Sequence, residues 1–175
     1  DQLGGKNMWT SVNDYKQFAN TFYSWTRDFS SVVYDGTHSD KRSDLITYQS
    51  YNEFSRGINS IPSSDANYTD NYKHIRRTNL LLQNAEAYAK PEDIKQYIGE
   101  AYFFRAYSYF DLLQLYGDVI ITKKPLDITD PEMKVKRNDR SEVVDLIIDD
   151  LNHAVENLPA FKELTTEEEG RISKE

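Results

Sequence analysis

Residues 35–44 hold the side chains that most resemble a cation site. His38, Asp40 and Asp44 lie close together in this segment and would supply nitrogen and carboxylate oxygen ligands. Aligned to the calcium loop, however, the segment has Asp40 where glycine is needed and Ile46 where the bidentate glutamate is needed. The spacing therefore favours a solvated turn, and we predict no metal site.

Two adjacent acids, Asp149 and Asp150, are the next candidates for chemistry. On a helix neighbouring side chains point about 100° apart, so the two do not form the facing pair that glycoside hydrolysis uses. The motifs of serine hydrolases, zinc proteases, phosphate loops and dinucleotide sites are also absent from the sequence. We predict a protein that is not an enzyme, with no catalytic residue and no cofactor, although a carboxylate pair formed only by folding stays open.

Tyrosine is abundant, with 13 residues in a chain of 175. Aromatic rings stack on the faces of pyranose sugars, and Asp, Asn and Arg side chains take the hydroxyl groups. Tyrosines in loops suit that role. Those at helical spacing, such as Tyr102 and Tyr109, are interpreted first as core residues.

Charge and composition exclude several classes of protein. A net charge of −8 without a Lys/Arg-rich run argues against binding nucleic acid, and the lack of cysteine removes disulfides and thiolate chemistry. No apolar stretch reaches membrane-spanning length. The chain begins at Asp1 without an apolar leader, so we expect that any signal peptide was removed or lies outside the given sequence, as a lipid anchor would.

Helical periodicity begins near the N-terminus. Aromatic residues recur every three or four positions between residues 9 and 29, and Thr10 or Ser11 is suited to cap this helix. Residues 32–68 are broken by Gly, Pro and polar clusters, and only residues 45–58 suit a helix. We therefore predict an irregular insertion between the first and second long helices.

A helical hairpin is predicted for residues 72–116. One face of its first arm is formed by Tyr72, Ile75, Asn79, Leu82, Ala85 and Ala89. Pro91 suits the first turn of the second arm, and Gly117 suits its end. This second arm is apolar around nearly its whole circumference, which predicts a helix buried on all sides.

Three polar residues fall on these apolar helices. Glu100, Arg105 and Asn79 each need a partner, because an unpaired buried charge or amide is costly. Glu100 and Arg105 are five positions apart and lie on different faces, so we expect each to pair elsewhere. A structural role is favoured over contact with a ligand.

A last helix is predicted from Ser141, as its cap, to Pro159. Its expected buried face is Val144, Ile147, Leu151, Ala154 and Leu158. Helical hairpins of this length predict an all-α fold of stacked hairpins, a tetratricopeptide-like α-solenoid.

Four segments together resemble the family of SusD/RagB-like outer-membrane nutrient-binding lipoproteins. Residues 72–82 resemble its pattern YxxIxxxNxLL, and residues 99–112 resemble GEAxFLRAxxYFxL. Residues 115–119 are similar to LYGxVP and residues 147–159 to IxxDLxxAxxxLP. The departures are Ile120 in place of Pro and Phe104 in place of Leu.

The resemblance continues to the end of the chain, where residues 170–175 look like the start of the family's next helix. It implies that residues 1–175 are the N-terminal helical part of a single SusD-like domain, truncated at the start of that helix. The missing C-terminal part is then expected to be this part's partner.

The family consists of cell-surface lipoproteins of Bacteroidetes. The resemblance implies surface binding of oligosaccharide nutrients and their delivery to a SusC-like TonB-dependent outer-membrane transporter. The alternative is a tetratricopeptide-like scaffold that binds a peptide or protein partner.

The resemblance also implies which residues contact the ligand. In related proteins the irregular region before the YxxIxxxN helix contributes to the ligand-facing surface. The expected contacts are Asp40, Arg42, Asp44, Tyr48, Tyr51 and Tyr68.

Overall fold

The computed structural model describes residues 8–26, 57, 58, 60, 62–127 and 129–174. The chain divides into two compact units, one made of Asp1–Ser24 and Ala66–Glu175 and the other of Trp25–Asp65. Few residues of the second unit are among those described, so the account below concerns the first.

The described residues form helices and two isolated β-bridges, without a strand. This confirms the predicted all-α fold. The described residues of the first unit form four α-helices and several short 3-10 helices. In order they are α1 (Val12–Asn20), η1 (Thr21–Trp25), α4 (Ala66–Glu86), η3 (Pro91–Ile94), α5 (Lys95–Tyr116), η4 (Pro131–Lys134), α6 (Arg140–Asn157), η5 (Phe161–Glu163) and η6 (Thr166–Glu168).

Local signals predicted several helix ends correctly. The Ser11 hydroxyl accepts a hydrogen bond from the Asp14 amide and caps α1. Pro91 opens η3, which leads into α5. Gly117 ends α5 in a left-handed conformation with φ of 69°, which a residue with a Cβ rarely adopts.

Helix α4 differs from its predicted range. It begins at Ala66 and ends at Glu86, so Tyr68 lies on a helix rather than in an irregular segment, and Ala89 lies in the turn after it. The helix begins earlier because Tyr68 packs against Tyr72 and Tyr116. Such long-range packing overrides the weak local helix preference of residues 66–71.

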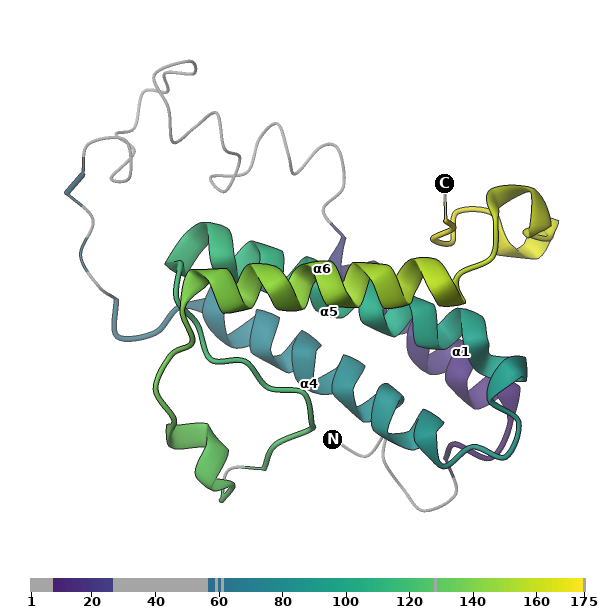
Figure 1. Ribbon diagram of the computed structural model, residues 1–175, viewed down its shortest axis with the longest axis horizontal. Helices are drawn as coiled ribbons and strands as arrows, with labels where there is room; N and C mark the ends of the chain where they lie inside the picture. Colours follow the sequence, from purple (N-terminus) through teal and green to yellow (C-terminus); the bar gives the residue numbers. More distant parts are fainter. Residues whose placement is uncertain (1–7, 27–56, 59, 61, 128, 175) are drawn as a thin grey trace. The chain divides into compact units, whose positions relative to one another are not determined.

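Helix α5 packs between α4 and α6, and α1 packs against α5 (Figure 1). The core between α4, α5 and α6 is built from fully buried side chains such as Ile75, Tyr109, Leu112 and Val143. Each contributes roughly 1.5–3 kcal/mol through removal of apolar surface from water. Gly99 allows close approach of the chain after α6, since a Cβ there would lie 2.9 Å from the Leu158 side chain.

The prediction that α5 is buried on all sides is wrong for the described residues. Phe110 is 50% exposed, and other large side chains of α5, such as Phe103 and Leu115, are only partly buried. The described neighbours of α5 cover its flanks toward α1, α4 and α6. One strip along α5, which includes Phe110, therefore has no described element packed against it.

Helix α6 corrects two further predictions. Its cap is Asp139 and not Ser141, because the Asp139 amide donates to the Glu142 carboxylate at 2.9 Å and the helix begins at Arg140. Leu151 is 40% exposed and Val144 is only partly buried. The buried face instead comprises Val143, Leu146, Ile147, Asp150 and Ala154. The helix turns this way because Asp150 faces a buried arginine of α5.

Candidate functional site

A cavity of about 370 Å³ opens between the first half of α4 and the chain that follows α5. Its lining divides into an apolar and aromatic floor and a polar rim. The floor includes Tyr68, Tyr72, Ile120 and Leu126, and the rim includes Lys73, Arg76, Lys124 and Glu132.

Helix α4 places three of these side chains on one face, because Tyr68, Tyr72 and Arg76 are spaced four residues apart. The ring centroids of Tyr68 and Tyr72 are 4.8 Å apart, and those of Tyr68 and Tyr116 are 5.2 Å apart with the rings perpendicular. The Tyr72 hydroxyl donates to the Ile120 carbonyl at 2.8 Å, and burial raises the pKa of Tyr72. The two tyrosines of the floor are therefore held both by packing and by a hydrogen bond to the chain that follows α5.

The rim consists of charged side chains that are already paired. Lys124 Nζ lies 2.6 Å from the Glu132 carboxylate and Lys73 Nζ lies 2.7 Å from that of Asp70. Arg76 donates to the Leu126 carbonyl at 3.1 Å and to Asp127 at 3.2 Å. Exposed pairs of this kind add only about 0–1 kcal/mol to stability, so these groups can exchange partners with a ligand's hydroxyls at little cost.

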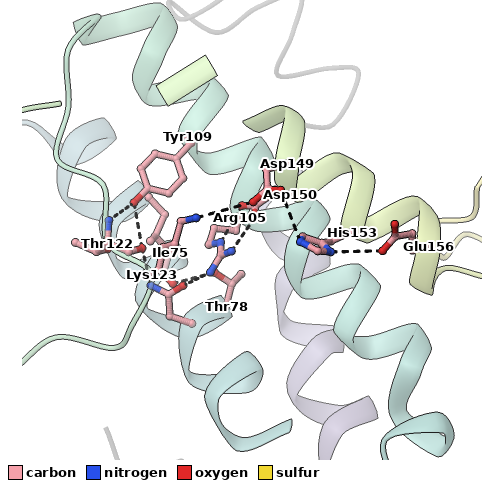
Figure 2. Close-up of polar contacts among 11 residues, drawn as sticks. Ile75, Thr78, Arg105, Tyr109, Thr122, Lys123, Asp149, Asp150, His153 and Glu156 are labelled. Carbon is pink, nitrogen blue, oxygen red and sulfur yellow. Dashed lines mark hydrogen bonds and ion pairs between the residues drawn. The ribbon is translucent and has the colours of Figure 1, made fainter. Parts of the chain in front are cut away.

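Behind the cavity lies a buried polar network. Arg105 of α5 donates two hydrogen bonds to Asp150 of α6, at 2.8 and 2.6 Å, and one to the Asn79 amide oxygen of α4 at 2.7 Å. Asn79 in turn donates to the carbonyls of Thr122 and Lys124. Figure 2 shows Arg105 directed toward Asp150 from α5. The structural role expected for Arg105 and Asn79 is confirmed.

Glu100 has a separate partner. Arg171 donates two hydrogen bonds of 2.8 Å to its carboxylate and a third to Asn20. Burial raises the pKa of Glu100, while the bonds from Arg171 act in the opposite direction. The pair fastens the C-terminal segment to α5 and α1, and the expectation that Glu100 and Arg105 pair elsewhere is confirmed.

Among the six expected contacts, the structure places Tyr68 in the cavity. The other five, Asp40, Arg42, Asp44, Tyr48 and Tyr51, lie outside the described residues. Sequence reasoning missed Tyr72 and Arg76 as cavity residues, although their four-residue spacing from Tyr68 was a usable signal. The wall residues Ile120, Thr122 and Lys124 carried no such signal, because they follow α5 without periodicity.

No group of His, Asp and Glu in the described part of the chain is arranged to hold a metal ion. His38, Asp40 and Asp44 fall outside that part. Of the helices described, none combines the length and apolarity needed to cross a membrane.

An aromatic floor with a hydrogen-bonding rim suits a pyranose ring, whose faces are apolar and whose edges carry hydroxyls. Residues 5–170 match the SusD-like family, described as starch-binding and associating with the outer membrane. The chain belongs to this family.

Individual relatives agree with this assignment. A SusD-like protein of Formosa agariphila is 36% identical over 104 residues, covering 57% of this chain and 20% of the relative. The crystal structure of a SusD-like protein from Bacteroides fragilis superposes with a TM-score of 0.78 at 24% identity, covering 99% of this chain and 34% of that one. A laminarin binding SusD-like protein aligns with a TM-score of 0.59 at 28% identity, covering 69% of this chain and 26% of that one.

This SusD-like chain thus spans about a fifth to a third of the length of these relatives. The shared fold is the helical, tetratricopeptide-like arrangement predicted from the sequence.

Proposed function

We propose that the protein binds oligosaccharide nutrients at the cell surface and delivers them to a SusC-like TonB-dependent transporter of the outer membrane. The cavity with its aromatic floor and polar rim is the observation that carries this proposal. It is supported by the family's description as starch-binding and associating with the outer membrane, and by a relative that binds laminarin. A lipid anchor outside this chain would hold the protein at the membrane.

Binding would proceed without covalent chemistry. Tyr68 and Tyr72 offer ring faces and edges to the C–H groups of a sugar, while Arg76, Lys124 and Glu132 exchange hydrogen bonds with its hydroxyls. Aromatic contacts of this kind contribute about 0.5–1.5 kcal/mol each. Many weak contacts of this type allow release to a transporter, and the protein acts as a binder rather than an enzyme.

The proposal extends beyond the cavity. Asp40, Arg42, Asp44, Tyr48 and Tyr51 would add to the ligand-facing surface, and residues 1–175 would form the N-terminal helical part of one SusD-like domain. The remaining, C-terminal part of that domain would complete the site.

The binding step is tested by calorimetry on the intact protein with a panel containing laminarihexaose, maltohexaose and cellohexaose. We expect at least one to bind, and Tyr68→Ala to weaken binding about 3- to 10-fold, the equivalent of one lost aromatic contact. Phe161→Ala is the matched control, because this ring is 63% exposed and lies outside the cavity.

Two results would count against the proposal. Failure of every glycan in a broadened panel would remove the binding role, and release of shorter sugars during incubation would indicate an enzyme. The transporter step is tested separately, by purification from the outer-membrane fraction, where a SusC-like protein is expected to co-purify. Sugar binding without that partner would leave a binding protein that does not deliver to a transporter of this type.

The alternative of a scaffold for a peptide or protein is favoured by one observation. Three apolar residues one helical turn apart on the outer face of α6, Ile148, Leu151 and Val155, are 40–56% exposed. If the C-terminal part of the domain covers this stripe, hydroxyl-radical labelling of the intact protein will leave the side chains of Ile148, Leu151 and Val155 unmodified. An exposed stripe in the intact protein would favour the scaffold.

A further inference from the structure

One wall of the cavity is a short segment, residues 119–124, that follows α5 after Gly117 and Asp118 and is extended up to Thr122. Ile120 and Thr122 line the cavity, while Ile121 between them lines a different hollow beside α6. Lys124 lines the cavity too and, with Lys123, a further hollow. The alternation from Ile120 to Thr122 is what an extended chain produces, since successive side chains point to opposite sides. The only bridge pairing of this segment among the described residues is between Val119 and Asn138. Its remaining backbone groups must be held by other means.

Tyr109 of α5 holds the middle of the segment. The Thr122 amide donates to the Tyr109 hydroxyl at 2.7 Å, and the same hydroxyl donates to the Thr122 carbonyl at 3.3 Å. Figure 2 shows the ring of Tyr109 with its hydroxyl directed at the Thr122 backbone. Tyr109 has no exposed surface and is not part of the cavity lining, so a ligand in the cavity does not touch it.

Asn79 of α4 holds the same segment from a second direction. Its amide nitrogen donates to the Thr122 carbonyl at 2.9 Å and to the Lys124 carbonyl at 3.2 Å. Because its amide oxygen accepts from Arg105, the direction of the nitrogen is fixed. Arg105 is itself oriented by two bonds to Asp150, so the position of the wall depends on three helices.

We propose that Tyr109 and Asn79 are positioning residues of the glycan cavity: they set the place of Thr122 and Lys124 from behind, without contacting the sugar. This inference rests on the proposed function. Its consequence is that affinity for the sugar depends on buried hydroxyl and amide groups, because a binding site must hold its contacts in place before the ligand arrives.

The test compares two substitutions of the same chemistry in the intact protein. Tyr109→Phe removes the hydroxyl that holds Thr122 and keeps the buried ring. Tyr15→Phe is the matched control, because Tyr15 is also fully buried and its hydroxyl donates to the backbone carbonyl of Asn84, at the opposite end of α4 from the cavity. Laminarihexaose, or the tightest-binding member of the glycan panel, is the probe.

We expect Tyr109→Phe to weaken binding about 3- to 10-fold and Tyr15→Phe to change it less than twofold. Hydrogen exchange at the Thr122 amide should accelerate in Tyr109→Phe alone, and saturating sugar should slow it again. A general loss of stability would not produce this local pattern.

A second variant, Asn79→Asp, tests the same inference if Tyr109→Phe does not fold. Asn79→Asp keeps the oxygen that accepts from Arg105 but replaces the donor to Thr122 and Lys124 with a carboxylate oxygen that their carbonyls repel. Binding should weaken here as well. The inference is overturned if exchange at Thr122 accelerates while affinity matches that of Tyr15→Phe, or if neither variant changes the exchange.

Failure of the proposed function gives a different result. If no member of the glycan panel binds the unchanged protein, the proposed glycan-binding function is wrong. Hydrogen exchange at the Thr122 amide still reports whether Tyr109 and Asn79 hold the wall. If the sugar binds and the variants do not weaken binding, only the positioning role falls.

Discussion

Helix α5 carries two buried arginine–carboxylate pairs with the same geometry and different consequences. Arg105 joins Asp150 across two helices and connects through Asn79 to the cavity wall. Glu100 joins Arg171, which belongs to the segment after α6, and the contacts of that pair reach Asn20 and Tyr97 rather than the cavity. The same type of ion pair therefore positions the cavity wall in one region and attaches the segment after α6 in the other.

Both pairs are almost fully buried, since Arg171 and Glu100 are 10% and 0% exposed. The side chains of Arg105 and Asp150 are 6% and 0% exposed. Removal of either one would leave the charge of the other buried, unpaired and out of reach of water. Arg171 belongs to the segment after α6, so its pair fastens that segment and does not join two long helices. The first pair is the one whose disruption the fold tolerates least.

The largest expected effect follows from Asp150→Ala. Removal of the carboxylate leaves the buried Arg105 charge without its bidentate partner, so the free energy of unfolding should fall by about 3–5 kcal/mol. Sugar affinity should fall as well, since Asn79 loses its oriented partner. Urea unfolding and calorimetry of the folded fraction measure the two effects. If the sugar affinity of Asp150→Ala were unchanged, the Arg105–Asp150 pair would have no influence on the cavity. The two pairs of α5 would then not differ in the way described above.

A smaller effect is expected for Glu100→Ala. The free energy of unfolding should fall by about 1–3 kcal/mol, because Arg171 loses two charge-assisted bonds while the contacts between the long helices stay in place. Sugar affinity should stay within twofold of the unchanged protein, since the cavity does not depend on this pair. Equal weakening of binding by both variants would show that general stability, and not the connection through Asn79, governs the site.

The smallest expected effect concerns pH. Burial lowers the pKa of His74 on α4 to about 4, below its unfolded value of about 6.5. The unfolded chain therefore takes up the proton first, so stability that is complete above pH ~6.5 is lost as the pH falls toward ~4. After allowance for partial exposure, the loss is about 1 kcal/mol.

His74→Asn should remove this contribution. Because carboxylates also titrate in this range, the measured quantity is the difference in unfolding free energy between the variant and the unchanged protein at pH 7 and at pH 4.5. Parallel pH profiles for the two proteins would show that His74 does not contribute.

The sequence was sufficient for features that depend on near neighbours. Pro91 and Gly117 mark the start and end of the hairpin's second arm because their backbone preferences are intrinsic. The face of α4 was predicted in part, since Ile75, Asn79 and Ala85 are buried as expected. The polar residues of the apolar helices were also recognised as needing partners, because burial of an unpaired charge is costly whatever the fold.

What the sequence could not supply was the identity of those partners. Arg105 and Asp150 are separated by 45 positions, and Glu100 and Arg171 by 71, so no local pattern connects them. The misplaced buried face of α6 has the same origin, since Asp150 turns that helix toward Arg105. The cap is different, because Asp139 and Glu142 form a local capping box that the sequence already contained.

The sequence by itself determined an all-helical protein of the SusD-like type, because helical periodicity and the four matching segments are properties of the chain alone. Only the tertiary structure decided which side chains form the cavity and what holds its wall. Thr122 and Lys124 become wall residues because Tyr109 and Asn79, on two other elements, bind their backbone. Backbone hydrogen bonds carry no side-chain signature, so their partners emerge only when the helices are packed.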